Sequence, residues 1–140
     1  MENFHWIILA AAAQAFLTIA VLLLLAARRR RAFAAGKVGS DAILNDRSWP
    51  DDVLKASNNY KSQFEIPVLF FAAIAVALAT GITSNAFVLL CWLFTAARIV
   101  HSIVHCGPNV LAPRFTSFLV SVIAVSGLWL IITKRMLVGI

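Results

Sequence analysis

Three long stretches of the chain contain no Asp, Glu, Lys or Arg, and more polar segments separate them. The uncharged stretches cover residues 3–27, 66–97 and 115–133. A helix needs about 20 apolar residues to cross a bilayer, so the first and last stretches each predict one span and the middle stretch begins two. We therefore expect an all-α integral membrane protein, a four-helix bundle of up-down topology that forms a single domain over 1–140. The predicted spans cover about residues 6–27, 64–82, 86–106 and 115–133.

The polar segments predict how these spans are connected. Residues 28–62 form the one long loop, and Asp51 is typical of a helix start inside it, because acidic side chains stabilise a first turn. A helix that begins there would continue into the second span, with a kink near Pro67. Gly107 predicts the end of the third span, and Pro113 predicts a second turn before the fourth.

Basic residues are concentrated in the long loop. The chain carries 12 Lys and Arg against 6 Asp and Glu, a net charge of +6. Cytoplasmic loops of membrane proteins are rich in Lys and Arg, so we expect residues 28–62 in the cytoplasm and both termini on the other side, despite Lys134 and Arg135. The compact chain fits a bacterial inner membrane. No base-stacking module accompanies the basic run, and we expect no nucleic-acid partner.

Ionisable residues also occur inside apolar sequence, where charge is costly. Arg98, His101 and His105 follow an uncharged run, and at 100° per residue they lie within about 60° on one helical face. Such residues usually face protein, water or a ligand, which makes this face the candidate functional site. The two histidines have the spacing of a metal-binding pair, but no third ligand stands at a known spacing. We expect packed histidines and no metal.

A second polar face precedes the second span. Asn58, Ser62 and Glu65 share one side of a helix, and Glu65 is expected to approach Arg98 across two antiparallel helices. Two interpretations remain open: a structural ion pair that lets a charged helix end insert, or a polar pocket that binds a ligand. Gln14 and Thr18 form a smaller stripe in the first span, for which hydrogen bonding between helices is expected.

Two stretches resemble the MAPEG family, the membrane-associated proteins in eicosanoid and glutathione metabolism. Residues 59–70 (NYKSQFEIPVLF) are similar to the signature of the family's second helix. The motif Arg98-x-x-His101, followed by Ala-Pro-Arg114, is similar to the third-helix region of its prostaglandin E synthase branch. The resemblance implies a homotrimer that binds glutathione between subunits near the cytosolic face, while lipophilic substrates enter from the bilayer. The ligand-binding residues that we infer from it are Arg98, His101, Asn59, Glu65, His105 and Arg114.

The sequence departs from this pattern at several positions. Ser62 stands where the family pattern places a glutamate, and His105 stands where it places an aromatic hydroxyl. Tyr60 is the only tyrosine in the chain. The leading hypothesis is a glutathione-dependent membrane transferase or peroxidase that acts on lipophilic electrophiles. The alternatives are a non-catalytic MAPEG-like protein that binds another anion or a lipid, and a small transporter or channel subunit.

Overall fold

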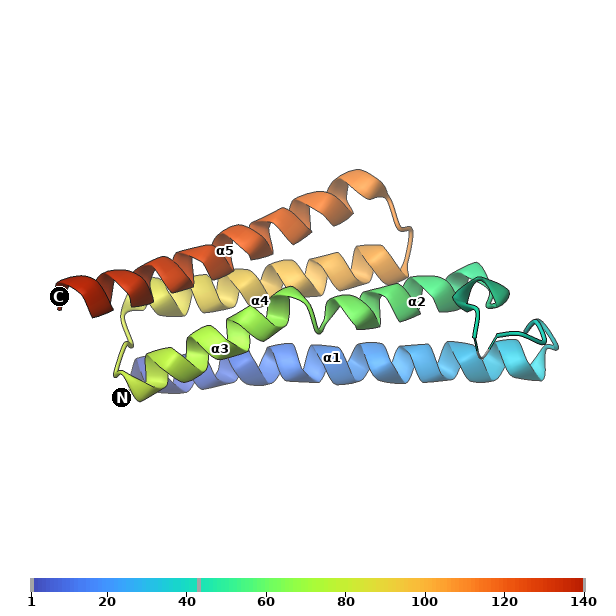
Figure 1. The fold of residues 1–140 in the computed structure, drawn as a ribbon, viewed down its shortest axis with the longest axis horizontal. Helices are drawn as coiled ribbons and strands as arrows, with labels where there is room; N and C mark the ends of the chain where they lie inside the picture. The colour runs from blue at the N-terminus through green and yellow to red at the C-terminus, as the bar shows by residue number, and fades with distance from the viewer. Residues whose placement is uncertain (1, 43, 140) are drawn as a thin grey trace.

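The computed structural model describes residues 2–42 and 44–139, which form helices joined by short connections (Figure 1). Four segments are long and apolar enough to cross a membrane, the second of them formed by α2 and α3 together. The chain is therefore a multi-pass integral membrane protein. The helices are α1 (Glu2–Ala34), η1 (Asp46–Ser48), α2 (Asp51–Ser62), α3 (Ile66–Ala79), α4 (Asn85–Cys106) and α5 (Leu111–Val138).

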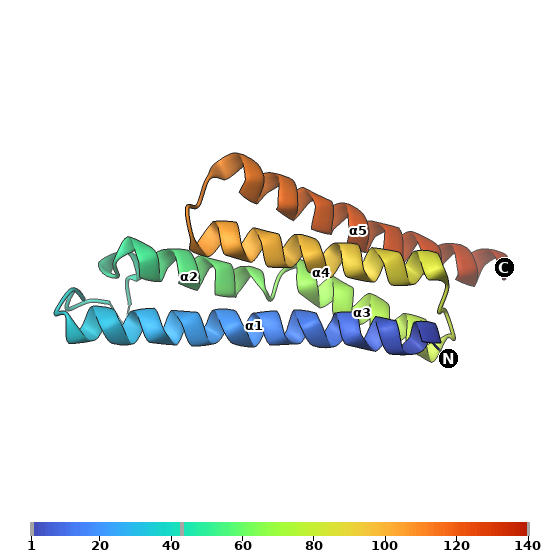
Figure 2. The same ribbon diagram turned by 180° about the vertical axis from the view of Figure 1, so that it is seen from behind.

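The helices form an elongated bundle whose two termini lie at one end (Figure 1). The polar connection between α1 and α2 lies at the opposite end, and the α4–α5 turn lies on that side as well (Figures 1 and 2). Helix α5 lies along α4 but leans away from it toward the α4–α5 turn, as both views show. A cavity lies in this part of the bundle, lined by residues of α2, α4 and the beginning of α5.

The second membrane segment is broken into two helices. Helix α2 begins at Asp51, as the sequence predicts, and ends at Ser62; α3 begins at Ile66 with Pro67 in its first turn. Proline has no N–H for a helical hydrogen bond and disfavours helical backbone in the residue before it, so it can start a helix more easily than continue one. The expected kink near Pro67 is confirmed, as a complete interruption over residues 63–65.

The start of α5 corrects one prediction from the sequence. Pro113 does not mark a second turn, because it lies inside the first turn of α5, which begins at Leu111. The first N–H groups of a helix have no partner within it, so a proline there costs no hydrogen bond. Helix α5 therefore begins four residues earlier than the predicted span at 115, and it carries Arg114 on its first turn.

The larger of two buried apolar clusters lies in the half of the bundle that contains the termini. Its centre is a stacked pair, Phe70 of α3 and Phe94 of α4, with ring centroids 4.2 Å apart and both side chains fully buried. Ile7 of α1 and Leu128 of α5 belong to the same buried cluster. All four membrane segments thus pack around one centre, which fixes the helices that carry polar residues in the other half.

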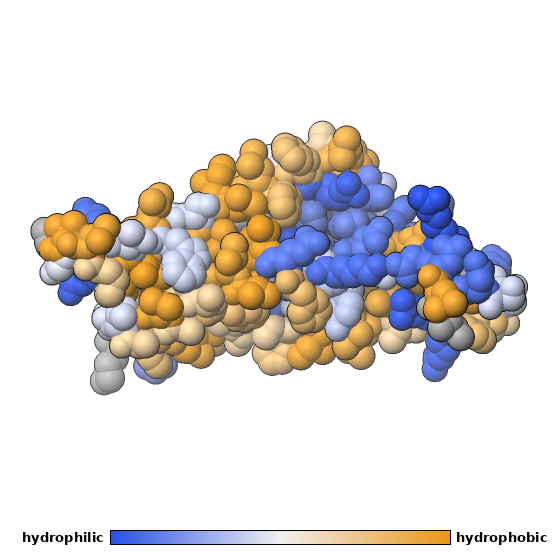
Figure 3. All heavy atoms as spheres, in the orientation of Figure 1, coloured by the Kyte–Doolittle hydropathy of each residue, from blue (hydrophilic) through white to orange (hydrophobic). Residues whose placement is uncertain are grey.

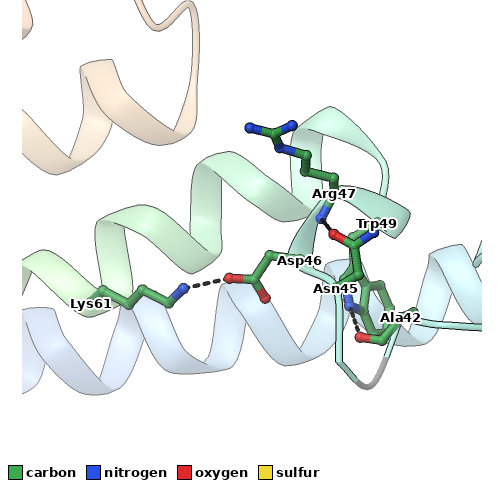
Figure 4. A network of polar contacts seen from close by, with 6 residues as sticks. All are labelled: Ala42, Asn45, Asp46, Arg47, Trp49 and Lys61. Atoms are coloured by element: carbon green, nitrogen blue, oxygen red, sulfur yellow. Dashed lines mark hydrogen bonds and ion pairs between the residues drawn. The ribbon is translucent and has the colours of Figure 1, made fainter.

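The loop before α2 is held by a small polar network at the basic end (Figure 4). Trp49 donates its indole N–H to the carbonyl of Ala42 at 3.0 Å, and Arg29 lies 5.1 Å from the Trp49 ring centroid. Asp46 forms an ion pair with Lys61 of α2. The hydrogen bond and charge of Lys61 hold the pKa of Asp46 below its usual value of 3.8. These contacts dock the loop on α2 without covering its polar face.

Candidate functional site

A buried network of uncharged polar side chains joins three helices beside the break in the second segment. Gln63, directly after α2, accepts a hydrogen bond from Gln14 of α1 at 3.0 Å and donates to Ser102 of α4 at 3.1 Å. Its amide nitrogen also lies 3.2 Å from the side-chain oxygen of Asn59. The expected hydrogen bonding between helices through Gln14 is confirmed. Among the described residues, the Thr18 hydroxyl donates to the carbonyl of Gln14 in its own helix and to no other helix.

Arg98 supports the helix break from α4. Its side chain is fully buried, and Nη2 donates to both the carbonyl and the hydroxyl of Ser62, each at 3.0 Å. Its Nε and Nη1 have no hydrogen-bond partner among the described residues. The last carbonyls of a helix need a partner from outside it, and Arg98 provides one at the end of α2. The guanidinium therefore stabilises an interruption that would otherwise expose unpaired backbone in the membrane.

The expected ion pair between Glu65 and Arg98 is not formed. Among the described residues the one salt bridge joins Lys61 and Asp46. Glu65 is exposed on the outer surface of the break, while Arg98 lies behind it and bonds to Ser62 instead. The reason is the interruption itself, because it offers the guanidinium a backbone carbonyl that an uninterrupted helix would have satisfied.

The two histidines of α4 form a chain with the backbone of α5. His101 Nδ1 lies 3.0 Å from the carbonyl oxygen of Arg114, and His101 Nε2 lies 3.3 Å from His105 Nδ1. The rings meet edge to face, with centroids 5.3 Å apart. This contact ties the first turn of α5 to the last turns of α4. No group of three or more His, Cys, Asp and Glu side chains is placed to hold a metal ion in the part of the chain that the structure describes.

A cavity of about 390 Å³ opens in front of these histidines, where α5 leans away from α4. Ligand pockets commonly have volumes of about 300–1,000 Å³, so it is large enough for a small molecule. One part of its wall is polar and charged, and the other is apolar and comes from α5. The lining residues are Asn58, Lys61, Ser62, Glu65, His101, His105, Leu111, Arg114, Phe115 and Phe118.

A second cavity of about 250 Å³ adjoins the first at the basic end. The two share Asn58, His105 and Arg114, so we treat them as one cleft, which we call the α2–α5 cleft. The second part is more polar than the first and adds Asp51, Leu54, Lys55 and Asn109 to the lining. The cleft thus changes along its length from a polar end to an end that contacts aromatic side chains.

The structure brings together most of the residues that the sequence singles out. Glu65, His101, His105 and Arg114 all line the cleft. Asn59 and Arg98 do not line it, because both are fully buried behind its wall. Asn59 donates to Cys106 Sγ at 3.1 Å.

Sequence reasoning missed the other wall of the cleft and one of its cations. Phe115 and Phe118 follow Arg114 on the first turns of α5, and the sequence interpretation treated them only as the first residues of the fourth span. Lys61 could have been found, because it is three residues after Asn58 and four before Glu65 and so shares their helical face.

Of the four consecutive arginines at 28–31, Arg28 is half-buried and the other three are exposed. Arg28 donates to the carbonyl of Asp52 at 2.6 Å and to the carbonyl of Cys106 at 2.8 Å. These bonds connect the end of α1 to the start of α2 and the end of α4. Arg28 therefore satisfies a helix C-terminus, as Arg98 does, and it is absent from the lining of the cleft.

The comparison with known proteins gives a family match. A family model described as "MAPEG family" matches residues 7–133 of the 140-residue chain. The match includes most of each of the four membrane segments and every residue that lines the cleft. No curated protein and no solved structure matches the chain.

Proposed function

We propose, from the premise that the chain belongs to the MAPEG family, that it is a glutathione-dependent membrane transferase or peroxidase acting on lipophilic electrophiles. The family includes glutathione transferases and peroxidases as well as other members. The observation that carries the proposal is the α2–α5 cleft, in which a charged polar region is continuous with an aromatic one. Such a cleft suits a reaction that joins a charged, water-soluble thiol to an apolar partner.

The polar end of the cleft has the charges that glutathione requires. Glutathione carries two carboxylates and one ammonium group at neutral pH. Lys55 and Arg114 supply cations for the carboxylates, and Arg114 can make paired hydrogen bonds to one of them. Lys61 adds positive charge to the wall, although its ammonium group is already paired with Asp46. Asp51 and Glu65 supply carboxylates for the ammonium group. In this arrangement the thiol would lie toward the middle of the cleft, beside His105.

The apolar end of the cleft suits the second substrate. Leu111 and Phe115 are exposed side chains on the first turns of α5, and Phe118 lies one turn further along. An electrophile dissolved in the bilayer could reach this end without crossing water. Binding both substrates in one cleft would raise their effective concentration, which is a large source of rate enhancement for a reaction between two molecules.

We also propose a homotrimer in a bacterial inner membrane. Hydrophilic residues reach well into the middle of one face of the molecule, next to apolar surface (Figure 3). Polar groups at bilayer depth need protein or water around them, so a neighbouring subunit on this face would shield them from lipid. The basic loop would lie in the cytoplasm and both termini outside, which makes the fold an up-down bundle.

A second candidate function rests on Arg98. The resemblance assigns this arginine to glutathione, but its side chain is fully buried and bonded to Ser62 at the helix break. A MAPEG-like protein in which this arginine stabilises the helix break and does not bind glutathione could bind another anion or a lipid in the same cleft, without catalysis.

Thermal unfolding in detergent with and without millimolar glutathione tests the proposal. A ligand at about 100 times its dissociation constant stabilises a protein by about 2.7 kcal/mol. We expect such a shift in the wild type, a smaller one in Arg114→Gln, and an unchanged one in the control Arg30→Gln, which removes an exposed arginine outside the cleft. Formation of a glutathione conjugate of chlorodinitrobenzene then separates the two candidates. Binding with no conjugate and no peroxide reduction favours the non-catalytic function, and no shift at any concentration contradicts glutathione binding.

A further inference from the structure

The contacts of the two histidines determine which of their nitrogens carry protons. A carbonyl oxygen can only accept a hydrogen bond, so His101 Nδ1, 3.0 Å from the carbonyl of Arg114, must be protonated. In a neutral His101 ring, Nε2 then carries a lone pair and accepts from His105 Nδ1 at 3.3 Å. A neutral His105 with a proton on Nδ1 has its lone pair on Nε2. This is the single arrangement of two neutral rings that satisfies both contacts.

His105 Nε2 is the end of this chain, and it makes no hydrogen bond among the described residues. His105 is also one of three residues that line both parts of the α2–α5 cleft. An unused basic nitrogen therefore lies where the polar part of the cleft meets the aromatic part. In many enzymes an imidazole acts as a base in this way: one ring nitrogen donates its proton to an acceptor, which leaves the lone pair on the other nitrogen available.

We propose that His105 Nε2 is the base that takes the proton from the glutathione thiol, with His101 as the residue that positions it; this role rests on the proposed function. The S–H bond breaks, its electron pair stays on sulfur, and the proton moves to Nε2. The thiolate forms a bond to the electrophilic carbon, whose leaving group departs with the electron pair of the broken bond. The imidazolium then gives up the proton, to a basic leaving group such as an alkoxide or, when chloride leaves, to water, so charge and protons balance over the turnover.

The other polar groups of the cleft are less suited to this role. Both nitrogens of His101 are committed to hydrogen bonds. Ser62 accepts from Arg98 and donates to the carbonyl of Asn59. The carboxylates are weaker bases than an imidazole, since their unperturbed pKa values lie about 2 units lower. Tyr60 packs its ring against Phe64 and is absent from the lining.

Several charged groups surround His105 and shape its titration. On its own helix these are Arg98 and His101, and α5 contributes Arg114. Helix α2 contributes Asp51, Lys55 and Lys61, and the break after it contributes Glu65. A pH–rate profile measured on a single protein would combine the titrations of all these groups. The informative quantity is therefore the difference between the profiles of the wild type and a variant that lacks only the imidazole of His105.

The test compares His105→Gln with the wild type in conjugation of glutathione to chlorodinitrobenzene. General base catalysis contributes about 10²–10⁴-fold, so we expect kcat to fall by that factor. The melting shift produced by glutathione should persist, because the cations that hold the carboxylates remain. The acidic limb of the wild-type pH–rate profile should be absent from the variant. His101→Gln should lose less activity and keep that limb, and His5→Gln, at the other end of the molecule, should behave as the wild type.

A second measurement does not depend on turnover. Diethyl pyrocarbonate acylates unprotonated imidazole nitrogens, so it should modify His105 in the wild type, and bound glutathione should slow that modification. If His105→Gln does not fold, His105→Asn and this protection experiment provide the test. Full activity in a folded His105 variant, or modification that glutathione does not slow while it shifts the melting temperature, overturns the proposed base. No glutathione binding by the wild type overturns the proposed function, and this role with it.

Discussion

Replacing Arg98 by alanine should destabilise the fold and leave glutathione binding intact. The side chain is fully buried, and it donates two hydrogen bonds to Ser62 at the break between α2 and α3. The sequence resemblance predicts the opposite order of effects, with loss of ligand binding first. The substitution therefore distinguishes an arginine that holds the backbone from one that holds a carboxylate.

The expected magnitude follows from the groups that the substitution leaves behind. The Ser62 carbonyl loses its Arg98 donor, and an unsatisfied buried polar group costs about 1–3 kcal/mol. Truncating a large buried side chain also leaves a cavity, which adds roughly 1 kcal/mol or more. Removal of Nε and Nη1, which have no partner among the described residues, returns part of this cost. We expect a net loss of about 2 kcal/mol, and hence a melting temperature lower by roughly 5–8 °C.

Thermal unfolding in one detergent, with and without glutathione, measures both quantities. Arg30→Ala is the matched control, because it removes an exposed arginine of α1 and should leave the melting temperature unchanged. A double-mutant cycle with Ser62→Ala should give a coupling energy of about 0.5–3 kcal/mol, since the two side chains share a hydrogen bond. A variant that melts like the wild type but no longer responds to glutathione would refute this reasoning and make Arg98 a ligand-binding residue.

Three further substitutions test other parts of the structure. Gln63→Leu should lower the free energy of unfolding by about 1–3 kcal/mol in detergent, because it strips partners from three buried polar side chains. Asp46→Asn should remove a pH dependence of the melting temperature. Because the pKa of Asp46 is lowered, its pairing with Lys61 stabilises the fold above about pH 4, and this stabilisation is lost as the pH falls further. A variant whose melting temperature responds to acid as the wild type does would contradict the pairing. Gly107→Ala should weaken the α4–α5 turn, measured as faster proteolysis there, because an added Cβ would lie 2.9 Å from a backbone oxygen.

The membrane architecture could be predicted from the sequence for two reasons. Long stretches of the chain contain no charged residue, and proline and glycine mark where the helices end or break. The start of α2 at Asp51 and the break near Pro67 follow from local rules of helix initiation. The same rules gave a wrong prediction at Pro113, because a proline is equally compatible with a turn and with the first turn of a helix. Sequence alone does not distinguish these two cases.

The candidate site was predictable only in part, because it depends on how three helices meet. Helical spacing places His101 and His105 on one face, and it groups Asn58, Ser62 and Glu65. It does not reveal that α5 leans away from α4 and completes the cleft with Phe115 and Phe118. Nor does it show that the interruption supplies a carbonyl for Arg98, which is why the expected ion pair with Glu65 is absent.

The break in the second segment connects the stability of the fold to the geometry of the cleft. Ser62 accepts from Arg98 through its carbonyl and also lines the cleft, so the group that ends α2 also forms part of the binding surface. An uninterrupted helix would continue the polar face of α2 into the apolar half of the bundle, where the Phe70 and Phe94 rings stack. Ending α2 at Ser62 confines that face to the half where α5 diverges. On this argument the costly burial of Arg98 is retained because it keeps the polar wall of the cleft opposite the aromatic wall.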